Sequence, residues 1–321
     1  MGIDVYSLGS YLNPHHPSSD TRPPLPQLNV DEALISDFHH LDGPSEVNLP
    51  FNINVLRQGY LTKDIVTKFD AIYIQHHAWW IQSNWEILYN KPIIYRSIGQ
   101  SNAQNENMLK QFSARGNLRL LRYSPCEQYV DSFAGADYII RFSKDPDEFC
   151  KWTGNINSPI AIYGNIALRD SLTRDFFNLI CDTQPVQLYG HGNNYLAYND
   201  MKKALQNHKC FININSSPAS YTMSFIEAWM TGIPVITPGY KYGHSMNVHG
   251  NPKMYELPEL ISNEENGIIS DDIKVLSSYI TKFLNDDKFA SSISSAGRNT
   301  AMQYFDNKVT LPQWQEVFKN L

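Results

Sequence analysis

The chain has 321 residues, which is enough for two domains with separate cores. Hydrophobic residues make up 42% and charged residues 18%, a globular composition that excludes a disordered protein. The net charge of −6 gives no footprint for nonspecific nucleic-acid binding. No apolar run spans a bilayer, and the amino terminus has no signal-peptide pattern, so we expect a cytoplasmic protein (in the host cytoplasm if it is viral) without stable membrane insertion.

Metal and redox chemistry have little support in the residue pattern. The four cysteines are widely separated and none forms a C-x-x-C pair, so we expect free thiols. Three histidine pairs occur, but neighbouring residues on a strand point to opposite faces and seldom share one ion. We therefore predict no metal site; the pairs are His15-His16, His39-His40 and His76-His77.

The first half of the chain predicts short strands that end in polar residues. A strand over Ile3–Leu8 runs into Gly9 and Ser10, and a second strand is expected over Leu49–Val55. After a helix over Thr62–Phe69, a strand over Asp70–Gln75 runs into the third histidine pair, and a strand over Pro92–Tyr95 runs into Arg96 and a loop with Gly99 and Gln100. Carboxyl ends of parallel strands meet at one edge of a sheet, where ligands bind. Further expected elements are strands at Leu118–Tyr123 and Ala136–Phe142 and a helical stretch at Cys126–Phe133.

A Gly/Asn/Ser/Pro cluster over Gly154–Pro159 is the best linker signal, so Ile160–Tyr163 would open a second domain. A strand over Val186–Tyr189 then leads into Gly190-His191-Gly192-Asn193, where glycines allow a ligand to approach the backbone. Later elements are a helix at Tyr198–Gln206, a strand at Cys210–Asn215, a Gly-bounded loop with Lys241, and an amphipathic helix at Asp272–Leu284.

The most informative stretch is Ser220–Ile236. It predicts a short apolar helix with Phe225 and Trp229 on one face, ended by Gly232, and a new strand after Pro234. Strand, loop, helix and strand form a βαβ unit, in which nucleotides and phosphates bind at the helix amino end. Glu227 lies in this apolar helix, and we expect it to have a partner or a binding role, because Glu is rarely buried without a partner.

This stretch resembles the donor-site signature of retaining GT-B glycosyltransferases of the large family four, or group 1. That signature has an acidic residue, seven residues, Glu-Ala, and then Gly-x-Pro-Val. The matches are Glu227-Ala228, Gly232, Pro234 and Val235, with Tyr221, Met223 and Ile226 at its apolar positions. Ala219 stands where the family has its first acidic residue, and the family's Gly-Arg and Lys-Gly cations are not found; Arg169 and Arg174 lie in that neighbourhood.

The resemblance implies an α/β fold of GT-B type, with two Rossmann-like domains that face a central cleft. The expected limits are 1–157 for an acceptor domain, joined by a returning carboxyl-terminal helix at about 303–321, and 158–302 for a donor domain. It implies that Glu227 accepts hydrogen bonds from the nucleotide ribose. The expected donor-binding set is Glu227, Tyr221, Thr222, Met223, Ser224, Gly190, His191, Gly192, Asn193, Arg169 and Lys241. The expected catalytic residues are His77, His76 and Arg96, and the acceptor-side contacts are Gly9, Ser10, Gly99 and Gln100.

The predicted function is a metal-independent, retaining, hexosyltransferase-like glycosyltransferase without a cofactor. Its co-substrate is a UDP- or GDP-linked sugar, and its acceptor is a glycan, a small molecule or a modified base. One alternative is a viral-type glycosyltransferase that modifies a nucleic-acid base. The other is a noncatalytic nucleotide-sugar or glycan-binding module, which Ala219 and the missing cations keep open.

Overall fold

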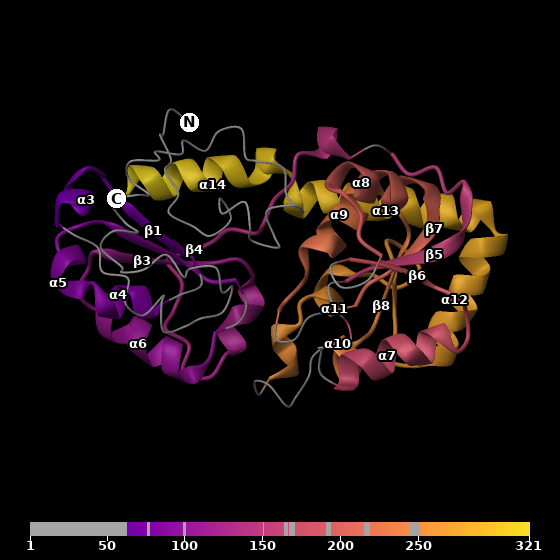
Figure 1. Cartoon of the computed structure of the whole chain (residues 1–321), viewed down its shortest axis with the longest axis horizontal. Helices are drawn as coiled ribbons and strands as arrows, with labels where there is room; N and C mark the ends of the chain where they lie inside the picture. The colour runs from indigo at the N-terminus through magenta and orange to yellow at the C-terminus, as the bar shows by residue number, and fades with distance from the viewer. Residues whose placement is uncertain are drawn as a thin grey trace.

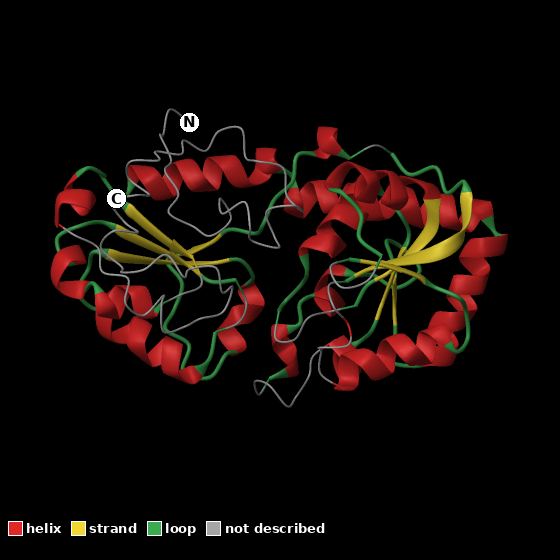
Figure 2. Ribbon diagram, viewed as in Figure 1, coloured by secondary structure: helices red, strands yellow, loops and turns green. Residues whose placement is uncertain are grey.

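The computed structural model describes residues 63–75, 78–98, 101–149, 151–163, 166, 171–190, 194–214, 219–243 and 251–321. The strands expected at Ile3–Leu8 and Leu49–Val55 lie outside these residues. Two parallel sheets lie side by side, each flanked by helices (Figures 1 and 2). The strand orders are β1-β2-β3-β4 and β6-β5-β7-β8-β9.

The first domain is built on the four-stranded sheet. Its strands are β1 (Ile72–Gln75), β2 (Ile93–Arg96), β3 (Leu118–Arg122) and β4 (Tyr138–Ile139), in register from Ile72 opposite Ile93. Alternate strand residues point to opposite faces, so Ile93 and Leu120 join one core while Ile94 and Leu121 join another. The helices are α3 (Lys63–Thr67), α4 (Trp79–Ser83), α5 (Trp85–Leu88) and α6 (Ala103–Ser113).

The stretch predicted as helical at Cys126–Phe133 is instead a 3-10 helix, η3, over Pro125–Tyr129. Pro125 and the hydroxyl of Ser124, which accepts from the Cys126 N–H, begin it. Val130 then returns to an extended conformation and Ser132 has a φ of 61°, so the helix does not continue. A second 3-10 helix, η4 (Pro146–Glu148), follows β4.

The second domain is built on the five-stranded sheet. Its strands are β5 (Ile156–Ile162), β6 (Gln187–Tyr189), β7 (His208–Ile212), β8 (Val235–Thr237) and β9 (Ile268–Ile269). Its helices are α7 (Ser171–Cys181), α8 (Tyr198–Asn207), α9 (Met223–Thr231), α10 (Tyr240–Gly243), α11 (Leu257–Leu260), α12 (Ile273–Asn285) and α13 (Asp287–Phe305), with the 3-10 helix η6 (Pro252–Met254). The helix expected at Asp272–Leu284 and the strand expected at Cys210–Asn215 thus form with shifted ends.

The expected linker at Gly154–Pro159 is wrong, because β5 already begins at Ile156 and pairs there with β7. Pro159 has no N–H to donate, and the register of this pair shifts between Ile156 and Pro159. The later part of the cluster, from Ile156 to Pro159, therefore belongs to a strand. The domain limits at 157 and 158 stay a prediction.

Helix α9 is set by caps at both ends. The Thr222 hydroxyl accepts from the Phe225 N–H at 3.2 Å, and Gly232 ends the helix with a φ of 85°. Residues 225–231 are all buried, because α8 and α13 pack beside α9 above the sheet (Figure 1). Apolar side chains therefore surround the helix, rather than lining the single face that the sequence suggested.

The chain crosses between the domains twice, and the crossings are hydrogen-bonded to each other. The Lys144 N–H donates to the Phe305 carbonyl at 2.8 Å, and the Asn307 N–H donates to the Lys144 carbonyl at 3.0 Å. After the second crossing, α14 (Asn307–Lys319) lies over the first sheet (Figure 1). There Trp314 packs against Tyr73 with ring centroids 6.1 Å apart. This confirms the predicted return of the carboxyl-terminal helix.

Gly297 allows α13 to approach α9, which gives a test of this packing. A Cβ at this position would lie 2.9 Å from both the Asn266 carbonyl oxygen and Trp229 Nε1. We expect Gly297→Ala to lower the free energy of unfolding by about 1–3 kcal/mol, although alanine normally favours helices. Chemical denaturation measures the change. The control is Ser295→Ala at an exposed site of α13, which should be neutral or slightly stabilising; equal effects of both changes would contradict the close approach.

Candidate functional site

The side chain of Glu227 lies at the junction of the two domains. It is the fifth residue of α9, and its Oε1 lies 2.6 Å from Nζ of Lys144, in the first crossing. The two side chains are 11% and 17% exposed, so the ion pair is largely removed from water. Nζ also faces the Tyr198 ring at 5.7 Å and the Phe149 ring at 6.0 Å. The carboxylate, which needs a partner in its apolar helix, is thus paired with a cation from outside that helix and the core of its domain.

The carboxyl ends of β7 and β8 meet the amino end of α9. Asn213, directly after β7, is fully buried and donates from Nδ2 to the Thr237 hydroxyl at 2.9 Å. The Thr222 hydroxyl is within 3.4 Å of Asn213 Oδ1 and 3.1 Å of the Ser224 hydroxyl. Thr222, Met223 and Ser224, at the start of the helix, are partly exposed. Sequence reasoning missed Asn213, although a polar residue that closes an apolar strand is a usable signal.

The residues just before α9 are anchored to the first domain. The Ser220 N–H donates to the Tyr123 hydroxyl at 2.6 Å, and the Tyr221 hydroxyl donates to the Tyr123 carbonyl at 2.7 Å. The Tyr221 ring packs between Tyr123 and Phe305 and is only 4% exposed. Burial raises the pKa of the Tyr221 hydroxyl. Tyr221, expected among the donor contacts, is therefore placed as a contact between the domains.

Comparisons with known proteins agree with this arrangement. Residues 160–316, which include α9 and its flanking strands, match a family model described as glycosyl transferase-like. HepE of Anabaena, solved in complex with UDP, superposes with a TM-score of 0.63 at 14% identity, over 92% of each chain. A glycosyltransferase of Rickettsia africae gives 0.54 at 17%, over 80% of this chain and 79% of that chain. The chain has the GT-B fold, and its residues 160–316 are similar to glycosyl transferase-like proteins. The fold class and the resemblance predicted from the sequence are thus confirmed.

Another similar structure is an α-glucosyltransferase in complex with UDP-glucose and DNA containing an abasic site. Its TM-score is 0.52 at 12% identity, with 80% of this chain and 82% of that chain covered. Identities this low show the fold alone. Among curated protein sequences none matches significantly.

Arg96 ends β2 of this GT-B protein, as expected, but its guanidinium is enclosed. It lies over the Phe142 ring at 4.4 Å and the Trp314 ring at 5.1 Å, and it donates to the Ile140 carbonyl at 2.9 Å. The residue is 8% exposed. In this conformation Arg96 joins α14 to the first sheet instead of facing a ligand.

Lys241 lies in the short helix α10, which follows β8, and not in the loop that the sequence suggested, while Gly190 directly follows β6. The Lys241 N–H donates to the carboxylate of Asp271 at 3.1 Å, while its side chain is exposed over the Tyr242 ring. Gly190 has a φ of 134°, in the range that favours glycine. The other predicted site residues lie outside the described part of the chain: His76, His77, Arg169, His191, Gly192, Asn193, Gly9, Ser10, Gly99 and Gln100.

Two buried carboxylates at the carboxyl ends of the first sheet were not foreseen. Glu106 of α6 accepts two hydrogen bonds from Arg122, at 2.9 and 2.7 Å. Glu127 of η3 is 2% exposed, and its Oε2 accepts from the Ser97 hydroxyl at 2.7 Å and the Tyr123 N–H at 3.0 Å. Burial raises the pKa of Glu127 to about 7 despite the nearby guanidinium and these bonds. The second carboxylate is therefore a group that changes charge near neutral pH.

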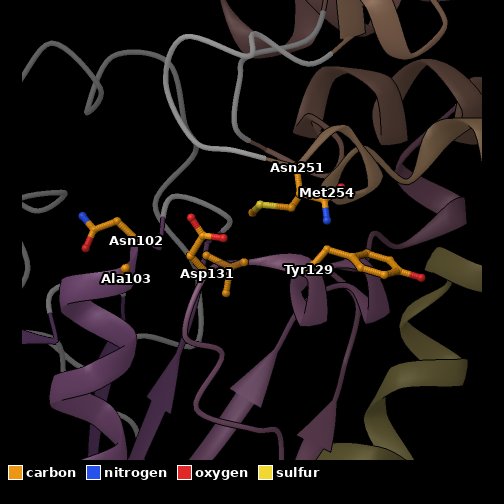
Figure 3. Close-up of a pocket in the computed structure, with 7 residues that line it drawn as sticks. Asn102, Ala103, Tyr129, Asp131, Asn251 and Met254 are labelled. Carbon is orange, nitrogen blue, oxygen red and sulfur yellow. The ribbon is translucent and has the colours of Figure 1, made fainter.

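A small cavity lies between the domains, lined on one side by η3 and the start of α6 and on the other by η6 (Figure 3). Asn251 and Met254 of the second domain face Asn102, Tyr129 and Asp131 of the first. Its volume of about 10 Å³ admits no more than a water molecule, so it is an interdomain contact and not a ligand site.

Within the described residues, no three His, Cys, Asp or Glu side chains form a group that fits a metal ion. The same part of the chain contains no helix with the length and apolar character needed to cross a bilayer. The predicted absence of a metal requirement remains a prediction.

The buried carboxyl of Glu127 makes stability depend on pH. The folded chain holds its proton up to a pH of about 7, whereas an unfolded chain releases it near the ordinary value of 4.5. The stability that this proton contributes is thus present below pH 4.5 and is lost as the pH rises through 7, a change of roughly 3 kcal/mol at most. Urea denaturation of wild type and Glu127→Gln at several pH values measures it. The wild type should lose stability relative to the variant as the pH rises from about 4.5 to about 7; parallel pH profiles would rule out the raised pKa.

Proposed function

We propose that the chain is a retaining glycosyltransferase that transfers a sugar from a UDP-linked donor to a hydroxyl acceptor. The match of residues 160–316 to the glycosyl transferase-like family supports donor binding by the second domain. Of the two nucleotides that the sequence left open, the complexes of HepE with UDP and with UDP-glucose favour UDP. The first domain would then present the acceptor across the cleft.

The observation that carries the proposal is the place of Glu227. It lies in the first turns of the helix that follows β7, at the carboxyl edge of the sheet in the matched segment. In a doubly wound sheet this edge is the nucleotide position. A carboxylate there accepts hydrogen bonds from both ribose hydroxyls, and such charged bonds contribute about 1.5–3 kcal/mol each.

The amino end of α9 supplies a second element of the site. The N–H groups of a helix's first turn lack intrahelical partners and carry a partial positive charge, which suits a diphosphate. The Thr222 hydroxyl accepts a hydrogen bond from the Phe225 N–H, and the partly exposed Met223 and Ser224 are the first two residues of the helix. We assign Thr222, Met223 and Ser224 to the diphosphate side of the donor.

In the proposed reaction the bond between the sugar C1 and the diphosphate oxygen breaks, and C1 bonds to the acceptor oxygen on the same face. The acceptor proton passes to the departing phosphate oxygen, so no protein nucleophile is needed. Charge develops on the diphosphate and on the oxocarbenium-like sugar, and fixed dipoles aimed at that charge are the protein's main contribution.

Glu227→Gln tests the donor site directly. We expect it to weaken UDP binding by about 10–100-fold, because a neutral amide replaces the charged acceptor of the ribose hydrogen bonds. Isothermal titration calorimetry gives the affinity, and a thermal-shift screen of UDP, GDP and their glucose conjugates gives the nucleotide preference.

Glu265→Gln, at an exposed position, is the matched control and should bind UDP like the wild type. The transfer reaction is followed as UDP released from UDP-glucose with and without candidate acceptors. Binding without any turnover would favour a noncatalytic module. No nucleotide binding to the wild type would refute the donor site altogether.

A further inference from the structure

Lys144 connects three parts of the molecule that the sequence did not link. Its Nζ contacts Glu227 Oε1 at 2.6 Å, in the proposed donor site. Its backbone N–H and carbonyl bond to Phe305 and Asn307, in the second crossing between the domains. One residue therefore joins the α9 carboxylate to both interdomain crossings.

The surroundings of Lys144 restrict where its ammonium group can go. The side chain is 17% exposed, and its Nζ lies 5.7 Å from the centre of the Tyr198 ring and 6.0 Å from that of the Phe149 ring. The Tyr198 hydroxyl donates to Glu148 Oε2 at 3.1 Å, which fixes that ring in turn. A flexible lysine gains little from an exposed ion pair, but a partly buried, enclosed ion pair has a defined geometry.

We propose that Lys144 is a positioning residue for donor binding, which holds one oxygen of Glu227 and leaves the other to accept from the ribose. This inference rests on the proposed donor site. Because the Lys144 backbone is bonded to the second crossing, the orientation of the carboxylate is tied to the contact between the domains. The recognition of the ribose thus depends on a side chain from outside the donor domain's core.

Other contacts hold the domains together without Lys144. Arg141 forms an ion pair with Glu256, whose side chain is 1% exposed. The Tyr123 hydroxyl and carbonyl also bond to Ser220 and Tyr221. Removal of the lysine charge is therefore expected to change ribose recognition more than folding.

The experiment compares UDP with 2′,3′-dideoxy-UDP, which has the same base and diphosphate but no ribose hydroxyls. Calorimetry gives both affinities for the wild type, Lys144→Met and Lys144→Arg. We expect the wild type to prefer UDP about tenfold or more, since a charged acceptor is left without its partners in the dideoxy complex. Lys144→Met should reduce this preference to about threefold or less, and Lys144→Arg should restore most of it because a cation again holds the carboxylate.

The matched control is Lys203→Met, which removes a lysine from the exposed ion pair with Asp200 on α8. It should keep the wild-type preference. Melting temperatures without ligand show whether each variant folds, and Lys144→Gln, a smaller change of polarity, provides the same comparison if Lys144→Met does not fold.

The possible outcomes distinguish a failure of the proposed donor site from a failure of the role proposed for Lys144. If the wild type fails to bind UDP, the donor site itself is wrong. If the wild type prefers UDP and the neutral Lys144 variants keep that preference, the donor site stands and the role of Lys144 is refuted. An equal loss of affinity for both ligands in those variants would show a general structural role and would also refute it.

Discussion

Burial of α9 is the constraint on which the rest of this arrangement depends. The helix carries apolar side chains on every side and packs between the sheet, α8 and α13, so a charge on it cannot be left without a partner. Glu227 is that charge, and its cation comes from the chain segment that leaves the first domain. The position of the crossing is therefore coupled to the electrostatics of a helix in the second domain.

The same crossing region satisfies the other buried polar groups at the junction. Tyr123 supplies both its hydroxyl and its carbonyl to the loop before α9, and the Phe142 N–H donates to the Tyr221 hydroxyl. These bonds place Ser220 and Tyr221 relative to the first sheet. The loop that leads into the proposed diphosphate site is thus fixed by the first domain, close to the position where Ala219 replaces the acidic residue of the related signature.

Local signals in the sequence were sufficient for α9 and for most of the described strands, although β9 was not foreseen and β4 is shorter than expected. Thr222 is a typical residue to begin a helix and Gly232 a typical residue to end one, and both have these positions in α9. Pro234 directly precedes β8, as expected. The linker prediction was wrong because Gly, Asn, Ser and Pro also occur at the start of an irregular strand. Only the pairing of β5 with β7 shows that this segment is part of a strand. The anchoring role of Tyr221 and the enclosure of Arg96 depend on Tyr123 and Trp314, which are far away in the sequence. Lys144 comes shortly after the strand expected at Ala136–Phe142, but its partner Glu227 lies 83 positions later, beyond any local pattern.

The distribution of charge at the proposed donor site follows from this geometry. Family members use an Arg and a Lys to neutralise the diphosphate, and the sequence has no such pair at the matching place. In the described part of the site the ammonium group of Lys144 is already paired with Glu227, so it is not a free counterion for phosphate. In the proposed site the amino end of α9 then has to contribute more to binding the diphosphate than it does where an Arg and a Lys are present. Its N–H groups are held in place by the Thr222 cap and by burial of the helix, so they need no reorganisation when charge moves onto the leaving diphosphate. The apolar packing that makes Glu227 costly to bury is thus the same packing that would make the helix dipole effective in catalysis.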